Sequence, residues 1–256
     1  MAIKPILFNT EMVQAYLDGR KTCTRRSVSP RQFMGMLPDK CKNAVPDEFL
    51  KDKRMMFKPY CDMTDTELIM TAYKAPYEPG DILYVRETWQ CWRAHRYEAT
   101  ADIRFRAGGD DVRLQFANGN TDSIDRYDFD TFVHKWFSHN GEWKPSLFMP
   151  KEAARIWLKV TDVRVERLQE ITEDQTEEEG FLFTPPCLHL TGENYCDIDG
   201  PCTSKIKYCD MSAGELFGKV LWNSTIKKAD LDRYGWDANP YVWVISFERC
   251  EKPEGV

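Results

Sequence analysis

Apolar and polar positions follow strand-like patterns in several short stretches of this chain. Residues 4–8 and 82–85 are apolar runs typical of strands, and a Pro-Gly-Asp turn precedes the second run. Residues 156–160 and 163–165 alternate with opposite parity, which predicts a strand with a bulge or break between its halves. Residues 241–247 are apolar on both parities, which predicts a strand buried on both faces.

Helices are predicted mainly from their capping residues. Asn9 or Thr10 caps an amphipathic helix that Gly19 is suited to end. Thr172-Glu173-Asp174-Gln175 and Ser212-Ala213-Gly214-Glu215 are capping boxes, and each predicts a helix start.

Three stretches of irregular pattern separate these elements, at about residues 27–73, 90–142 and 181–210. We interpret them as insertions, the second with strands near 101–106 and 112–116. The whole pattern predicts one α+β domain, built as a small, mostly antiparallel β-barrel with peripheral helices.

Composition narrows the class of protein. The chain has 256 residues, 42% of them hydrophobic, and a net charge of -6. This charge argues against sequence-blind coating of nucleic acid but permits a local basic cleft. No apolar run reaches the roughly 18 residues that a membrane helix requires, and the N-terminus lacks the apolar stretch of a signal peptide. We therefore expect a cytoplasmic protein without a membrane partner.

A basic cluster opposes the overall negative charge. The sequence Gly19-Arg20-Lys21-Thr22-Cys23-Thr24-Arg25-Arg26 contains four cations, at the point where the first helix should turn into a strand. Such a cluster predicts contact with an anion or a polar ligand. Arg20, Arg25 and Arg26 are accordingly candidates for substrate or nucleic-acid binding.

Nine cysteines include four in the stretch 181–210, namely Cys187, Cys196, Cys202 and Cys209. Four thiolates can hold a structural zinc ion tetrahedrally, and a stretch without apolar periodicity needs some cross-link. No Cys-x-x-Cys pair is present, so free thiols remain an equal alternative and disulfides a third.

Several motifs, in this order along most of the chain, resemble those of the ASCH domain family. They are Gly19-Arg20-Lys21-Thr22-x-Thr24-x-Arg26, Gly80-Asp81-Ile82-Leu83-Tyr84-Val85, Thr161-Asp162-Val163, Glu179-Gly180 and Trp243-Val244-Ile245-Ser246-Phe247. Arg86-Glu87-Thr88-Trp89 and the stretch from Trp143 to Lys151 are similar to long ASCH proteins of bacteriophages and prophages. Compact members lack the long insertions of this chain.

The resemblance implies a PUA-like β-barrel that binds RNA or a nucleobase in a bacterial cell. Some members are amidohydrolases that remove the acetyl group of N4-acetylcytidine, and others are associated with RNA cleavage. The family's catalytic positions correspond to Lys21, Thr24 and Glu179. No cofactor is implied for the chemistry, and zinc would be structural.

The residue chemistry permits these roles, and each residue also has a simpler interpretation. Cationic neighbours and burial favour a neutral lysine, which can take a proton from a hydroxyl or a water. Arg26 or backbone amides could then stabilise an oxyanion. Alternatively Lys21 binds phosphate, Thr24 is an ordinary strand residue, and Glu179 belongs to a solvated acidic run.

Tyr84 and Arg86 lie on one parity of their strand and are candidates to line the cleft opposite Lys21. Trp89 is a candidate to stack on a base, with core packing as the alternative. The leading hypothesis is hydrolysis of an N-acylated nucleoside. The alternatives are a non-catalytic reader of RNA or modified bases with a regulatory or phage–host role, and a metal-dependent ribonuclease.

Overall fold

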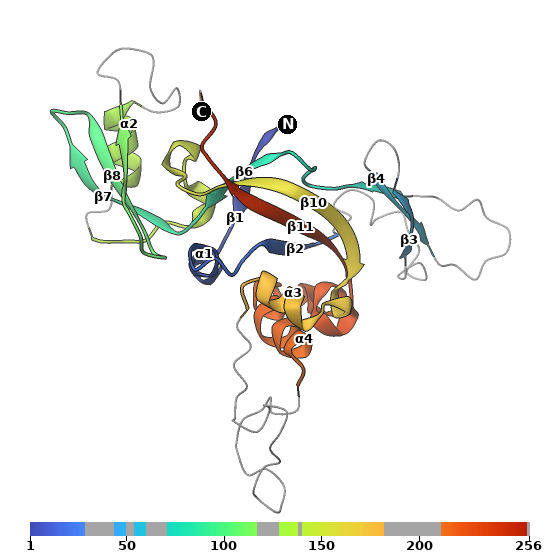
Figure 1. Ribbon diagram of the computed structural model, residues 1–256. Helices are drawn as coiled ribbons and strands as arrows, with labels where there is room; N and C mark the ends of the chain where they lie inside the picture. Colours follow the sequence, from blue (N-terminus) through green and yellow to red (C-terminus); the bar gives the residue numbers. More distant parts are fainter. Residues whose placement is uncertain are drawn as a thin grey trace, which may run out of the picture. The chain divides into compact units, whose positions relative to one another are not determined.

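The computed structural model describes residues 1–28, 44–49, 54–59, 71–116, 128–137, 140–181 and 211–254. Within them the protein is a mixed α+β chain with mostly antiparallel sheets and few helices (Figure 1). The chain divides into two compact units. The first unit comprises Met1–Thr22, Pro79–Asp162 and Ser246–Val256, and the second comprises Cys23–Glu78 and Val163–Ile245.

A five-stranded sheet contains most of the strands that were predicted from apolar runs. Its order is β1 (Ile3–Leu7), β6 (Ile82–Arg86), β10 (Trp157–Arg167), β11 (Tyr241–Cys250) and β2 (Cys23–Ser27). Strand β1 pairs with β6 in parallel, whereas β10 pairs with β6 in antiparallel orientation. The division between the units falls within β10 and within β11.

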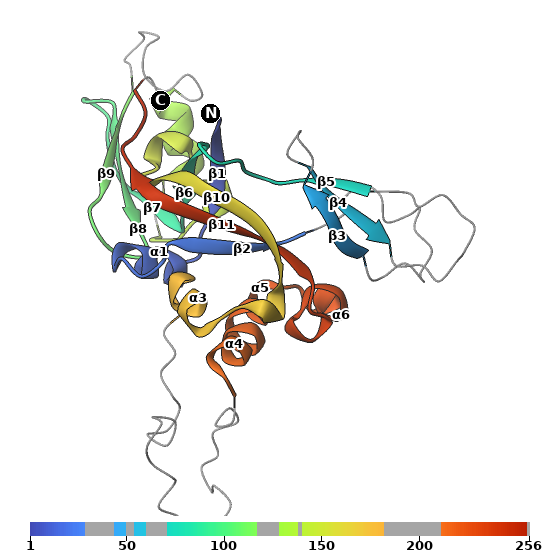
Figure 2. The same ribbon diagram turned by 45° about the vertical axis from the view of Figure 1, so that its right-hand side comes forward.

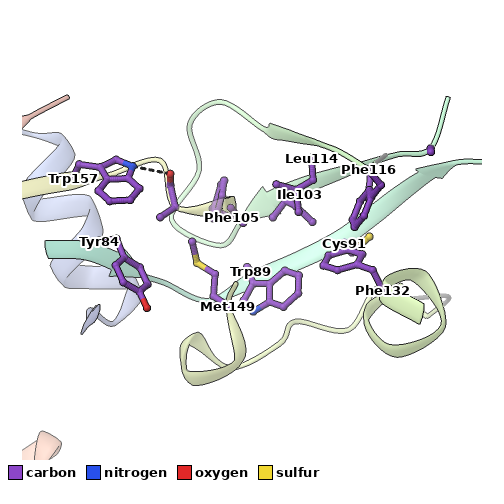
Figure 3. Close-up of a cluster of buried hydrophobic side chains, with 14 of the residues drawn as sticks. Tyr84, Trp89, Cys91, Ile103, Phe105, Leu114, Phe116, Phe132, Met149 and Trp157 are labelled. Atoms are coloured by element: carbon purple, nitrogen blue, oxygen red, sulfur yellow. Dashed lines mark hydrogen bonds between the residues drawn. The ribbon is translucent and has the colours of Figure 1, made fainter. Parts of the chain in front are cut away.

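In the first unit, α1 (Thr10–Leu17) follows β1 and begins as its cap predicts, since the Asn9 side chain accepts a hydrogen bond from the Met12 amide at 2.8 Å. A three-stranded antiparallel sheet of β7 (Trp89–His95), β8 (Thr100–Phe105) and β9 (Val112–Gln115) packs with α2 (Phe129–Trp136). The short helices η2 (Ser146–Phe148) and η3 (Lys151–Ala153) precede β10. Aromatic and aliphatic side chains of these elements form one buried cluster (Figure 3).

The second unit contains a group of short helices around its own apolar cluster. These are η4 (Leu168–Glu170), α3 (Glu173–Glu178), α4 (Ala213–Leu216), the π-helix η6 (Phe217–Trp222), α5 (Asn223–Thr225), η7 (Lys228–Asp230), α6 (Leu231–Tyr234) and η8 (Trp236–Ala238). Both predicted capping boxes are present, at the starts of α3 and α4. A sheet of β3 (Ala44–Phe49), β4 (Arg54–Pro59) and β5 (Thr71–Lys74) belongs to the same unit (Figure 2).

Some sequence-based expectations need correction. The stretch 27–73 contains β3, β4 and most of β5 instead of being irregular throughout, and the stretch 90–142 contains most of β7 and α2, which were not predicted. Strand β10 is continuous, so of the predicted bulge or break near Thr161-Asp162 the break is wrong. None of the three sheets in the described part of the chain closes into a barrel. No helix in the described segments is long and apolar enough to cross a membrane.

Candidate functional site

The basic cluster begins in the turn between α1 and β2. Gly19 has a φ of 78°, and the backbone amides of Arg20 and Lys21 both donate to the Ala15 carbonyl, at 3.0 and 3.1 Å. This turn directs Lys21 inward, where it is only 2% exposed and its Nζ lies 5.5 Å from the ring centroid of Phe8. Lysine is rarely this buried in proteins. The ring face offers a cation–π contact to the amine when it is protonated.

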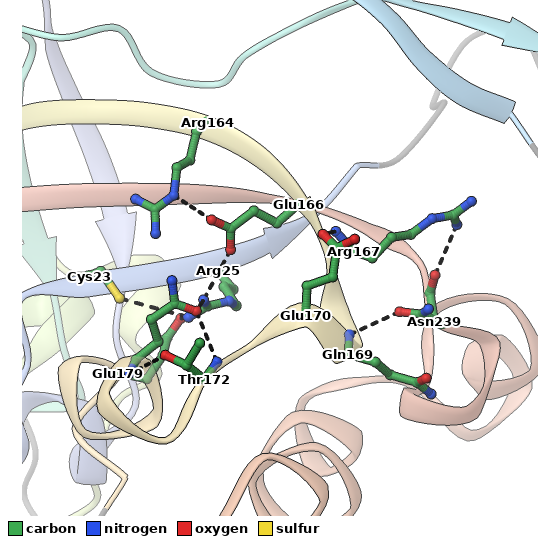
Figure 4. Close-up of polar contacts among 11 residues, drawn as sticks. Cys23, Arg25, Arg164, Glu166, Arg167, Gln169, Glu170, Thr172, Glu179 and Asn239 are labelled. Carbon is green, nitrogen blue, oxygen red and sulfur yellow. Dashed lines mark hydrogen bonds and ion pairs between the residues drawn. The ribbon is translucent and has the colours of Figure 1, made fainter.

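Arg25 is the centre of a buried polar network in the second unit (Figure 4). Its Nη2 donates to Oε1 of Gln175 at 2.8 Å and to Oε2 of Glu166 at 3.3 Å. Its Nη1 lies 3.4 Å from Oε1 of Glu179, and the Arg25 side chain is 1% exposed. Glu166 also accepts a hydrogen bond from Arg164. Arg25, predicted to contact a ligand, therefore acts as an internal counter-ion, because its guanidinium is sequestered from solvent.

Glu179 occupies the end of α3. It is the C-cap residue, and Gly180 follows with a left-handed φ of 83°. The carbonyl end of a helix disfavours a carboxylate. The Arg25 guanidinium opposes that effect in this structure, and the charge of Arg26 also acts on Glu179. The sequence correctly placed Glu179 at the helix end, but its counter-ion lies 154 positions earlier in the chain.

Thr24 is a polar residue of β2 whose side chain is buried. It is 0% exposed, and its Oγ1 has no hydrogen-bond partner among the described residues. Nε of the adjacent Arg25 is likewise buried without a partner. An unsatisfied buried polar group costs about 1–3 kcal/mol, so native proteins retain few of them without a reason. Thr24 and Arg25 are consecutive strand residues, so their side chains lie on opposite faces of β2, and each of these atoms is a separate polar group that a ligand or a water can satisfy.

Arg26 and Tyr77 add a second polar pair to the same unit. Burial lowers the pKa of Arg26, and interactions with Tyr77 and Glu179 oppose this shift. Burial also raises the pKa of the Tyr77 phenol, and Arg26 opposes that shift. The Arg26 side chain keeps partial solvent exposure. Arg26 is thus the cation of β2 that is best placed to meet a polar ligand.

The remaining predicted binding residues belong to the first unit. Arg20 forms an exposed ion pair with Asp18 at 2.8 Å. Nη2 of Arg86 donates to the Tyr84 hydroxyl at 3.3 Å, so these two predicted residues do lie together. Trp89 is 0% exposed and packs in the aromatic cluster. It therefore serves the core, because no face of its ring is open to a base.

The predicted zinc ligands Cys187, Cys196, Cys202 and Cys209 lie outside the described residues, so structural zinc stays a prediction. Within the described ranges, no group of three or more His, Cys, Asp or Glu side chains is arranged to hold a metal ion.

Sequence reasoning missed Glu166, Gln175 and Tyr77. Gln175 was visible only as a capping residue, yet its Oε1 accepts from both the Thr172 amide and Arg25. The sequence around Glu166 and Tyr77 does not indicate their partners, because Arg25 and Arg26 lie in a distant segment of the chain.

Comparison of the chain with family models, curated proteins and solved structures found no match.

Proposed function

We propose that this chain is a PUA-like protein of the ASCH type that binds RNA or a modified nucleoside and hydrolyses an N-acyl group from a cytidine-like substrate. One structural observation carries the proposal. The Thr24 hydroxyl is fully buried without a partner, next to an arginine that holds Glu179. These are two of the three positions that the ASCH resemblance implies for catalysis, and the third, Lys21, is also buried.

Hydrolysis of an amide needs a base, an oxyanion contact and a proton donor for the leaving amine. In this proposal Lys21 takes a proton from the attacking water, which the Thr24 hydroxyl orients. The oxygen adds to the acyl carbon, and Arg26 stabilises the negative charge on the tetrahedral intermediate. The proton on Lys21 passes by way of the Glu179 carboxylate to the exocyclic nitrogen as the carbon–nitrogen bond breaks, so both side chains return to their starting states. The products are the carboxylic acid and the free amine.

Arg25 is a positioning residue in this scheme. Its guanidinium donates to the Gln175 side chain in the first turn of α3 and to the Glu179 carboxylate at the C-cap, so it fixes the direction of that carboxylate.

The test is release of cytidine from N4-acetylcytidine by the purified chain and by Thr24→Val. Valine keeps the shape of threonine and removes only the unpartnered hydroxyl, so we expect stability to be unchanged or to rise by about 1 kcal/mol. Turnover should nevertheless fall about a hundredfold or more, the usual effect of losing an acid–base participant. Full turnover by Thr24→Val would refute the assigned role.

Glu179→Gln provides a second variant with a matched control. Glutamine keeps an oxygen for Arg25 but cannot transfer the proton, so turnover should fall while the fold persists. Glu178 lies on the same helix and is exposed. Glu178→Gln should therefore retain wild-type turnover, and Lys21→Met should lose it.

A non-catalytic reader is the second candidate, and the ion pair between Arg25 and Glu179 favours it by giving the carboxylate a structural role. In this case the wild type releases no cytidine but binds RNA in a salt-dependent manner. Arg26→Gln should then weaken binding, whereas Arg96→Gln, at an 83% exposed side chain, should not.

A further inference from the structure

A second candidate site lies in the first unit and shares no residue with the one just described. It is a pocket of about 250 Å³ at the end of β6, the last turn of α2 and the segment around η2. Its walls include Arg86, Lys135, Trp136, Leu147, Phe148 and Met149. We call it the Trp136 pocket.

The Trp136 pocket combines positive charge with aromatic surface. Lys135 Nζ lies 4.8 Å from the Trp136 ring centroid, and the Trp136 and Phe148 rings are 6.0 Å apart. Phe148 is 52% exposed, so part of its ring meets solvent. None of the described residues that line the pocket is acidic, although the chain carries a net charge of -6. Such a wall attracts an anion and offers a face for stacking.

Two hydrogen-bond donors of the pocket's lining residues are unsatisfied. Nε of Arg86 and Nε1 of Trp136 are buried and have no partner among the described residues. The other Arg86 nitrogens are occupied, since Nη1 donates to the Leu147 carbonyl at 3.2 Å and Nη2 to the Tyr84 hydroxyl at 3.3 Å. These contacts hold the guanidinium in place at the pocket wall. Both unsatisfied groups are donors, so their missing partners are acceptor atoms.

We propose that the Trp136 pocket binds a small planar aromatic ring that carries an anionic group. The ring stacks on the exposed face of Phe148 beside Trp136, and the anion pairs with Lys135 and Arg86. The pocket volume suits a single such unit, which can be one nucleotide or an aromatic carboxylate. This inference does not depend on the proposed hydrolysis.

The experiment is calorimetric titration of the full chain with cytidine 5′-monophosphate, indole-3-acetate, cytidine and inorganic phosphate. We expect one or both aromatic anions to bind. Cytidine should bind more weakly because it lacks the anionic group, and phosphate because it lacks the aromatic ring. Preference for the monophosphate would assign the site to nucleotides, and preference for indole-3-acetate would assign it to aromatic carboxylates. The proposal is overturned when neither anion binds with a Kd below about 1 mM.

Variants locate the binding. Lys135→Ala should weaken it about tenfold through loss of one charge-assisted contact. Phe148→Ala should weaken it at least about fivefold through loss of stacking.

Arg93→Ala is the matched control for Lys135, because Arg93 is an exposed cation 4.2 Å from the Trp92 ring centroid and does not line the pocket. Tyr97→Ala is the control for Phe148, since Tyr97 is also an exposed aromatic residue. Equal binding by Lys135→Ala, Phe148→Ala and both controls would refute the assignment. Thr24→Val should bind like the wild type, so failure of the proposed hydrolysis and failure of this pocket can be told apart.

Discussion

Two buried guanidinium–carboxylate groups, one in each unit, are built differently. In the first unit Arg155 donates from Nε and Nη2 to the two oxygens of Glu87, both at 2.9 Å, and its guanidinium lies 4.1 Å from the Phe105 ring centroid. In the second unit Arg25 divides its donors between Glu166, Gln175 and Glu179.

The geometry of the two groups indicates their roles. Bidentate pairing occupies both oxygens of Glu87 and gives a rigid, specific contact. Arg25 makes its carboxylate contacts at 3.3 and 3.4 Å and leaves its own Nε unsatisfied. The first arrangement suits a structural ion pair. The second keeps a polar group incompletely satisfied beside a candidate catalytic carboxylate, as functional sites often do.

Removal of Arg155 should have the largest effect. Arg155→Ala leaves the Glu87 carboxylate, 1% exposed, without its partner, and loss of one member of a buried pair costs about 3–5 kcal/mol. Urea unfolding measures the change. Arg96→Ala is the control, because its pair with Asp130 is exposed and its loss should cost no more than about 1 kcal/mol. Equal stability of the two variants would contradict a structural role for Arg155.

Removal of Arg25 should destabilise the chain less, by about 2–4 kcal/mol. In this variant Glu166 still has its contact with Arg164 and is 19% exposed. Glu179 still interacts electrostatically with the positive charge of Arg26. Unfolding of Arg25→Ala and Arg155→Ala under the same conditions ranks the two groups. If Arg25→Ala lost more stability than Arg155→Ala, the network around Arg25 would contribute more to stability than the pair of Arg155 and Glu87.

Local sequence signals predicted the ends of elements well. The Asn9 cap, both capping boxes and the glycines after α1 and α3 are where the pattern placed them. Strand β7 and the sheet of β3, β4 and β5 were missed, because their segments show no regular alternation. Helix α2 was missed although Asp128 caps it, accepting a hydrogen bond from the Thr131 amide at 2.8 Å.

The functional interpretation of single charges was less predictable from sequence. The cluster around Arg25 showed an excess of cations, but charge density says nothing about which cation has a counter-ion far along the chain. Glu87 and Arg155 are 68 positions apart, and no local sequence pattern indicates that they form a pair. Long-range partners depend on the tertiary fold, so a basic motif predicts a polar site more reliably than it assigns each residue within it.

The smallest effect that separates the two groups is a pH dependence. Burial raises the pKa of Glu87, and the hydrogen bond and charge of Arg155 only partly oppose this shift. A raised pKa means that the folded state binds the proton more tightly than the unfolded state. The associated stability is therefore complete below the ordinary pKa of 4.5 and is lost as the pH rises through the folded value.

We expect the stability of the wild type relative to Glu87→Gln to fall as the pH rises from acidic to neutral, because glutamine cannot ionise. Urea unfolding of both proteins across this range measures the difference. A difference that instead grows with pH would mean that Arg155 outweighs burial and holds the Glu87 pKa below its usual value. The ion pair of Glu87 and Arg155 would then stabilise the folded state at neutral pH, because its close geometry would offset the cost of burying the Glu87 carboxylate.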